Sequence, residues 1–184
     1  MRAFVVLAFG LAACPRPEPE APAEATVTVV EAASPLQGWD LTDANGEPFT
    51  EAELKGRRTA VVVGTAASKA SRATLSVLGE VMPMLPELQV VFVDVDPTED
   101  ASALNALVAA KAPGVRALRG PQRAIDPVMA SLRTAYAVST TAPGIDHSTS
   151  VVLVDERATV VAYVHRPNDA SRVLADVKGQ FKKP

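Results

Sequence analysis

Runs of apolar residues, separated by polar and turn-forming segments, predict the order of the strands and helices in this chain. Thr59–Val63 and Gln89–Val95 are nearly continuous and rich in β-branched residues, which is typical of strands buried on both faces of a sheet. Ser148–Val154 and Thr159–Val164 are predicted to be two further strands. The four residues between them, 155–158, are short enough to join them as a tight hairpin.

Helical periodicity lies between these strands. Leu75, Leu78 and Met82 recur at the spacing of one helix face, which predicts a helix that begins at Ser71 or Arg72 and ends before Pro83. The further helices expected are residues 96–111, capped by Asp96, residues 122–136, with Pro127 as a kink or a start near Asp126, and residues 170–181, capped by Asp169.

The segment before the first long strand carries two local signals. Asn45-Gly46 between short alternating runs predicts a β-hairpin, and Thr50 followed by Glu53 fits a capping box at the start of a helical turn. Residues 26–30 fit either a first strand or an extended connection. Because strands and helices alternate, the sequence predicts an α/β fold with an N-terminal hairpin and helices on both faces of a partly parallel sheet.

The first residues predict an export signal. Arg2 precedes an apolar run, residues 3–10, that is too short to span a bilayer as a mature helix, and Leu11-Ala12-Ala13-Cys14 follows. This arrangement resembles the bacterial lipobox, in which the leader is cut before a cysteine that carries a lipid. An ordinary signal peptide with an incidental cysteine is the alternative. The lipobox interpretation is favoured, and it makes residues 1–13 a signal peptide and Cys14 the lipidation site.

The next segment predicts a tether to the membrane. Residues 14–35 are rich in Pro, Glu and Ala and bury too little apolar surface to fold, whereas residues 36–184 are long enough for one domain. We therefore expect a lipid-anchored protein of the bacterial cell envelope whose domain faces the periplasm or the exterior. The formal net charge of −3 provides no basic surface, so nucleic acid is not an expected partner.

Four segments, in order, carry a resemblance to the Sco/SenC family of copper proteins. Residues 41–50 (LTDANGEPFT) resemble the family's opening hairpin, and residues 54–57 (LKGR) resemble its LKGK turn. Residues 91–100 (VFVDVDPTED) resemble its FVSVDPERD strand and helix cap. Residues 144–148 (GIDHS), followed by 151–155 (VVLVD), resemble its VDHS element before a final hairpin.

The resemblance implies a thioredoxin-like three-layer α/β/α sandwich. It also implies a copper site made by two cysteines of a CxxxC loop and one distal histidine, and a role in delivering copper to cytochrome c oxidase. The histidine falls on His147 and the loop on residues 64–74, but Ser68 and Ser71 stand nearest to the cysteine positions, in a loop one residue shorter. A hydroxyl is a hard donor without redox chemistry, so neither a high-affinity Cu(I) site nor dithiol exchange is expected.

The other candidate metal ligands are weaker. A single imidazole makes a poor metal site, so a hydrogen-bonded His147 without metal is favoured over His147 as a ligand. His165 follows a strand and is expected at the surface. The thioethers of Met82 and Met84 could bind Cu(I), but a methionine pair near a helix end more often fills the core. No resident cofactor is therefore expected, and copper is the one candidate.

The serine loop allows two other interpretations. Ser68 and Ser71 could form a nucleophile pair with His147, but acyl transfer also needs a positioned base and an oxyanion hole, and the sequence shows neither. A role for Ser71 as a helix N-cap is therefore favoured. Lys69 and Arg72 beside a helix start fit an anion site, but two solvated basic residues are favoured. An acidic patch lies at the end of the second long strand, and helix capping explains its Asp96 better than a hard-metal site does. The patch consists of Asp94, Asp96, Glu99 and Asp100.

These observations converge on a Sco-like protein that is not an enzyme. The favoured hypothesis is a binding or assembly partner in the envelope, linked to respiratory oxidase maturation. The first alternative is residual copper handling by His147 together with a partner's ligands. The second is a peroxidase or reductase of the wider thioredoxin group, which the absence of cysteine from the domain disfavours because the thiolate is the nucleophile in that chemistry.

Overall fold

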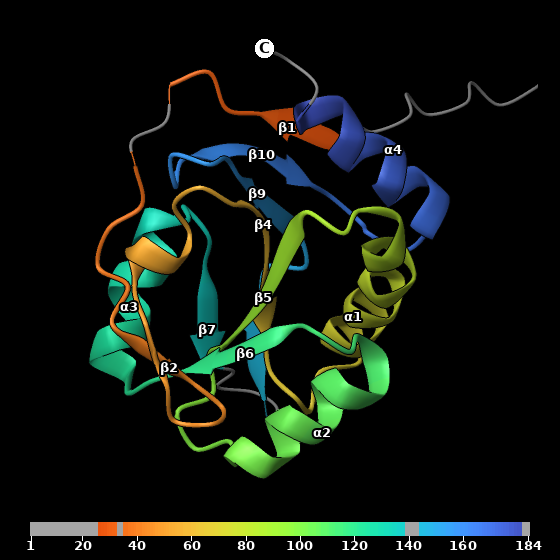
Figure 1. Cartoon of the computed structure of the whole chain (residues 1–184). Coiled ribbons are helices and arrows are strands. Elements are labelled where there is room, and N and C mark those ends of the chain that lie inside the picture. Colours follow the sequence, from red (N-terminus) through yellow and green to blue (C-terminus); the bar gives the residue numbers. More distant parts are fainter. Residues whose placement is uncertain (1–25, 33–34, 139–143, 182–184) are drawn as a thin grey trace, which may run out of the picture.

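An eight-stranded sheet forms the centre of the molecule in the computed structural model, which describes residues 26–32, 35–138 and 144–181 (Figure 1). Its strand order is β1-β10-β9-β4-β5-β6-β2-β3, and β7 pairs with β8 in a separate hairpin. The strands are β1 (Val27–Val29), β2 (Leu41–Asp43), β3 (Pro48–Phe49), β4 (Arg58–Gly64), β5 (Leu88–Asp94), β6 (Arg116–Arg119), β7 (Tyr136–Val138), β8 (Ile145–His147), β9 (Val151–Val154) and β10 (Val160–Val164).

Helices cover both faces of this sheet, which confirms the predicted three-layer arrangement. Ala60 and Val62 of β4 face one core cluster, to which α1, α2 and α4 contribute, whereas Val61 and Val63 face a second cluster with α3. The alternation follows from the period of two along a strand. The helices are α1 (Lys69–Val81), α2 (Ala101–Lys111), α3 (Gln122–Ser131) and α4 (Ala170–Phe181), with short 3-10 helices η1 (Glu51–Glu53) and η2 (Met82–Met84).

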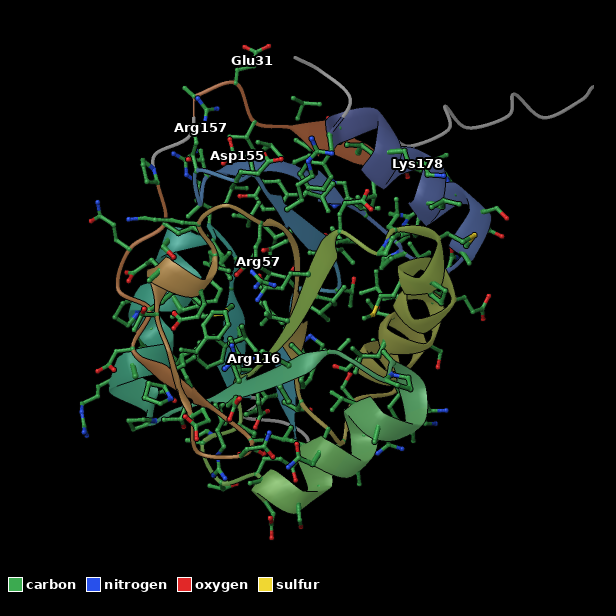
Figure 2. The ribbon with its side chains drawn as sticks, in the orientation of Figure 1. Glu31, Arg57, Arg116, Asp155, Arg157 and Lys178 are labelled. Carbon is green, nitrogen blue, oxygen red and sulfur yellow. The ribbon has the colours of Figure 1, made fainter. Side chains whose placement is uncertain are left out.

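The sheet is mixed in the way that the apolar runs predict. β4, β5 and β6 are parallel to one another, and the pairs β4–β9 and β9–β10 are antiparallel. The predicted hairpin at Asn45-Gly46 is present as β2–β3, with Gly46 at a φ of +90°, and Thr50 forms the predicted capping box with Glu53. At the turn between β9 and β10, Arg157 Nη2 forms an ion pair with Asp155 Oδ2 at 2.9 Å, and Figure 2 shows both residues at the rim of the sheet.

Some predicted helix boundaries are wrong. The helix expected from Asp96 begins at Ala101, because Asp96 accepts from Thr98 N–H in a turn and Asp100 provides the cap. The helix expected over 122–136 ends at Ser131, with Pro127 inside it, and Tyr136 begins β7. Residues 27–29 form a strand against β10, which decides between the strand and the extended connection that the sequence allows for residues 26–30. Across the described part of the chain, no helix is long and apolar enough to cross a bilayer.

Candidate functional site

The serine loop connects the end of β4 to the start of α1. Ser68 is the N-cap of α1, because its hydroxyl accepts a hydrogen bond from Ser71 N–H at 3.3 Å. The sequence favours Ser71 for this role, and that prediction is wrong. The helix begins two or three residues earlier than predicted, at Lys69. Ser71 therefore falls in its first turn, where its side chain points back toward the sheet and is only 1% exposed.

The hydroxyl of Ser71 joins this loop to the β7–β8 hairpin. Ser71 Oγ lies 3.3 Å from His147 Nε2 and accepts a hydrogen bond from Thr65 N–H at 3.3 Å. His147 Nδ1 lies 3.0 Å from the carbonyl oxygen of Ser148. Because a carbonyl oxygen only accepts, a neutral His147 carries its proton on Nδ1, and Nε2 accepts from the Ser71 hydroxyl. The structure therefore brings together two of the sequence-predicted residues, with Ser68 one helical turn away from them.

Gly64 provides the space in which these side chains meet. A Cβ atom at this position would overlap with Ser71 Oγ and would lie 3.2 Å from His147 Cε1. Gly64 is the last residue of β4, and its missing side chain would point to the face that α1 covers. The close packing of Ser71 against His147 thus depends on the absence of a side chain at Gly64.

Gly64→Ala is expected to separate Ser71 from His147 and to lower the free energy of unfolding by about 1–3 kcal/mol, because an added methyl group overpacks a closed site. Urea denaturation measures this change. Gly179→Ala in α4 is the matched control, since a Cβ there meets nothing within 4 Å, and it is expected to be neutral or to stabilise by about 0.5–1 kcal/mol. Equal effects of the two substitutions would contradict the close approach at Gly64.

Asp94 is a buried carboxyl, and the sequence pattern does not distinguish it from its acidic neighbours. It ends β5, pairs in register with Gly64, and is 1% exposed. Its Oδ1 accepts from Asp96 N–H at 3.2 Å, whereas its Oδ2 has no hydrogen-bond partner among the described residues. Burial raises the pKa of Asp94 to about 7, and the negative charges of Glu99 and Asp96 act in the same direction. The position was detectable, because Val90, Phe92 and Asp94 alternate onto one buried face.

The basic residues of the loop do not form an anion site. Arg72 Nε donates to the carbonyl oxygen of Ala66 at 2.9 Å and so helps to fix the loop before α1. Glu99 lines the same open hollow as Arg72, which offsets the positive charge. Lys69 is exposed. Solvated or structural roles therefore account for both residues.

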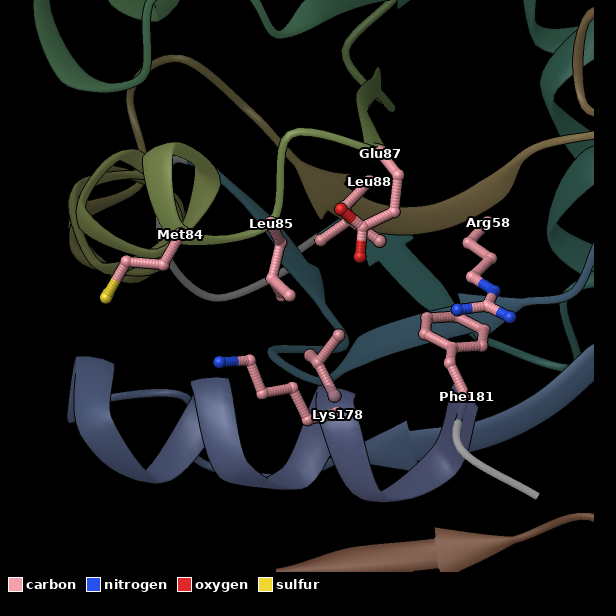
Figure 3. Close-up of a pocket in the computed structure, with 8 residues that line it drawn as sticks. Arg58, Met84, Leu85, Glu87, Leu88, Lys178 and Phe181 are labelled. Atoms are coloured by element: carbon pink, nitrogen blue, oxygen red, sulfur yellow. The ribbon is translucent and has the colours of Figure 1, made fainter.

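The methionine pair lies far from the serine loop. Met82 and Met84 form η2 at the C-terminal end of α1, a helix of 13 residues and so about 20 Å long. Met84 is 47% exposed and lines a hollow of about 320 Å³ between η2 and α4. Figure 3 shows this hollow, with Lys178 and Phe181 on its α4 side. The distance excludes a copper site shared by this pair and His147.

The donor set at the loop does not suit copper. Two hydroxyls and one imidazole are present, without the soft thiolates that Cu(I) prefers, and the described residues contain no group of three or more His, Cys, Asp or Glu side chains placed to hold a metal ion. A nucleophile role for Ser71 is also disfavoured, because a side chain that is 1% exposed is closed to substrate. His165, expected at the surface, is half-buried and hydrogen-bonded to Thr28 and Ser150.

Comparison with solved structures identifies Sco proteins as similar folds. The copper-bound ScoI of Arabidopsis thaliana is 21% identical, with a TM-score of 0.71, over 82% of this chain and 98% of that one. The apo Sco1 of Thermus thermophilus is 20% identical, with a TM-score of 0.73, over 87% and 99%. A SCO1/SenC family lipoprotein of Bacillus anthracis is 17% identical, with a TM-score of 0.68, over 80% and 95%. These structural similarities establish the fold alone.

Comparison of the sequence itself gives two results. No curated protein sequence matches the chain. The family model described as SCO1/SenC matches residues 29–182, which is most of the chain and includes the serine loop, Asp94 and His147. Cys14 lies outside both the match and the described residues. On the extent of this match, and with the fold in agreement, the chain belongs to the SCO1/SenC family.

Proposed function

We propose that this chain is a membrane-anchored, Sco-like lipoprotein without dithiol redox activity that acts as a binding or assembly factor, linked to the maturation of cytochrome c oxidase. The observation that carries the proposal is the serine loop. Ser71 lies 3.3 Å from His147, where the family resemblance places a thiolate beside the distal histidine. The scaffold of the site is retained, and its reactive groups are replaced.

The anchoring part of the proposal rests on the N-terminal sequence. Leu11-Ala12-Ala13-Cys14 fits a lipobox, and the B. anthracis relative in fold is described as a lipoprotein. Labelling the chain with a radioactive fatty acid in a bacterial host tests this part, with Cys14→Ser as the control. Incorporation that persists in Cys14→Ser would contradict lipidation at this residue.

One observation favours residual copper handling as a second candidate function. The hydrogen bond from His147 Nδ1 to Ser148 O fixes the ring and leaves Nε2 with its lone pair directed at the Ser71 hydroxyl. This is the arrangement in which a histidine offers one nitrogen to a metal. His147 would then supply one ligand, and a partner protein would supply the others, so that the cation is shared only during transfer.

Competition titration with Cu(I) and Cu(II) separates these two functions. The full chain in detergent, and its His147→Ala variant, are titrated against chelators of known affinity. The first proposal predicts that neither metal binds more tightly than about micromolar, because a single imidazole with two hydroxyls is a weak site. Nanomolar binding that His147→Ala abolishes would overturn it and would favour copper carriage. Capture of oxidase subunits from membranes by the tethered chain, and not by a chain with the serine loop replaced, would support the assembly role.

A further inference from the structure

The β7–β8 hairpin, which carries His147, lies outside the central sheet. Among the described residues its two strands pair only with each other, and each has three residues, so further packing is needed to fix their position. In the described part of the chain, two side-chain hydrogen bonds join these strands to helices. One runs between His147 and Ser71 of α1, and the other between Tyr136 and Asp126 of α3 (Figure 1). The hairpin is thus bonded to one helix on each face of the sheet.

Tyr136 lies directly opposite His147 in this hairpin. The two residues are partners in the antiparallel ladder, so their side chains point to the same face with Cβ atoms about 4.5–5.5 Å apart. Tyr136 and Ile145 also pack against the core cluster to which α3 contributes. A displacement of Tyr136 is therefore passed to His147 across a single pair of residues.

The hydroxyl of Tyr136 has an acceptor that is itself held in place. Tyr136 Oη donates to Asp126 Oδ1 at 2.7 Å, a short bond of the kind that carboxylates accept. Gln122 Nε2, one helical turn earlier in α3, donates to the same oxygen at 2.8 Å and so orients the carboxyl group. Burial raises the pKa of Tyr136 to about 12, and the hydrogen bond to Asp126 and its negative charge act in the same direction. The hydroxyl therefore remains a donor at neutral pH.

We propose that Tyr136 is a positioning residue for His147 and acts through its hydrogen bond to Asp126. With the hydroxyl held on α3, the hairpin places His147 Nε2 against the Ser71 hydroxyl, while Nδ1 keeps its proton on the side of Ser148 O. Without that bond, we expect the imidazole to leave Ser71 for part of the time and to exchange between its two neutral tautomers. The inference deepens the proposed function and rests on it for the identity of the site, since it names what holds the histidine there.

Nitrogen-15 NMR of the histidine rings tests the proposal on the full chain in detergent, at an alkaline pH where imidazoles are neutral. The chain has two histidines, so His165, with its own bonds to Thr28 and Ser150, is the internal reference. The wild type is expected to show His147 mainly as the Nδ1–H tautomer. Tyr136→Phe keeps the packed ring and is expected to lower that population at least about twofold, the smaller effect of one lost hydrogen bond, with His165 unchanged. An unchanged His147 signal overturns the proposal.

Three further variants separate positioning from a general loss of stability. Asp126→Ala removes the acceptor and is expected to reproduce the effect of Tyr136→Phe, whereas Asp126→Asn keeps an Oδ1 acceptor and is expected to retain most of the wild-type signal. Tyr163→Phe is the matched control, because it removes a tyrosine hydroxyl that bonds to Leu132 O but lies on β10, outside the hairpin. It is expected to leave the His147 signal unchanged, and a change as large as that of Tyr136→Phe would refute the assignment.

Neither copper nor an oxidase subunit is needed for these measurements. If capture of oxidase subunits fails while Tyr136→Phe still changes the His147 signal, the proposed function is lost and the positioning role stands. If capture succeeds while the His147 signal of Tyr136→Phe is that of the wild type, the positioning role alone is lost.

Discussion

Replacing Ser68 and Ser71 together by cysteine is expected to raise the affinity of the chain for Cu(I) by at least about a thousandfold. The double variant places a thiolate at the position of the Ser71 hydroxyl, 3.3 Å from His147 Nε2, and a second thiolate one helical turn earlier. Thiolates are the soft donors that Cu(I) prefers, and together with the imidazole they form a three-ligand set. Loss of the Ser68 cap costs about 1 kcal/mol, which a domain of this size tolerates.

Anaerobic competition titration under reducing conditions measures this gain. The single variant Ser71→Cys is expected to gain less, and addition of His147→Ala to the double variant is expected to remove part of the gain. If the double variant binds Cu(I) no more tightly than the wild type, the shorter loop has lost the geometry of a metal site. The absence of cysteine would then not be the reason why the chain lacks one.

Asp94→Asn is expected to stabilise the protein by about 3–4 kcal/mol at pH 8 and to have little effect at pH 4. The pKa of Asp94 is about 7 in the folded protein, above the value of about 3.9 for an unfolded aspartate, so folding favours the protonated carboxyl. The contribution of this group is therefore most favourable below pH 4. It is lost progressively as the pH rises from about 4 to 7 and stays lost above that. Asparagine has a similar shape and cannot ionise, so it avoids the loss.

Urea denaturation at pH 4, 6, 7 and 8 measures this difference between variant and wild type. Taking the difference is necessary because hydrogen-bonded carboxyls such as Asp43, whose pKa is lowered, change stability in the opposite direction with pH. Asp40→Asn, at an exposed position, is the control and is expected to change stability by less than about 0.5 kcal/mol at every pH. A difference for Asp94→Asn that is independent of pH would show that burial does not hold this carboxyl protonated.

The central sheet was predictable from the sequence because its strands are marked by continuous apolar runs. β4 and β5 match such runs closely, and their alternation onto two core clusters follows from strand geometry alone. The short elements were less predictable. β7 and β8 have only three residues each and are defined by pairing across residues 136–147, which no local pattern encodes.

The sequence was enough to select the residues of the candidate site, but it was not enough to assign a role to each of them. Ser68, Ser71 and His147 could be selected because the family resemblance aligns them with ligand positions. Which serine caps the helix depends on where the helix begins, and helix ends are set by competing hydrogen bonds worth about 1 kcal/mol each. Asp94 stands where the FVSVDPERD motif of the resemblance has serine, and its burial was readable from the alternation of β5.

The pairing of β1 with β10 has a consequence for the order in which the domain can fold during synthesis. Val27 pairs with Val164, so among the described residues the first strand, β1, pairs with the last strand, β10, and with no other. The central strand β4 can pair with β5 soon after both are synthesised, but its partner on the other side, β9, is synthesised much later. Contacts over such separations form late and slow the folding of a domain. The sheet of the described residues therefore cannot be completed until β10, which ends at Val164, has left the ribosome.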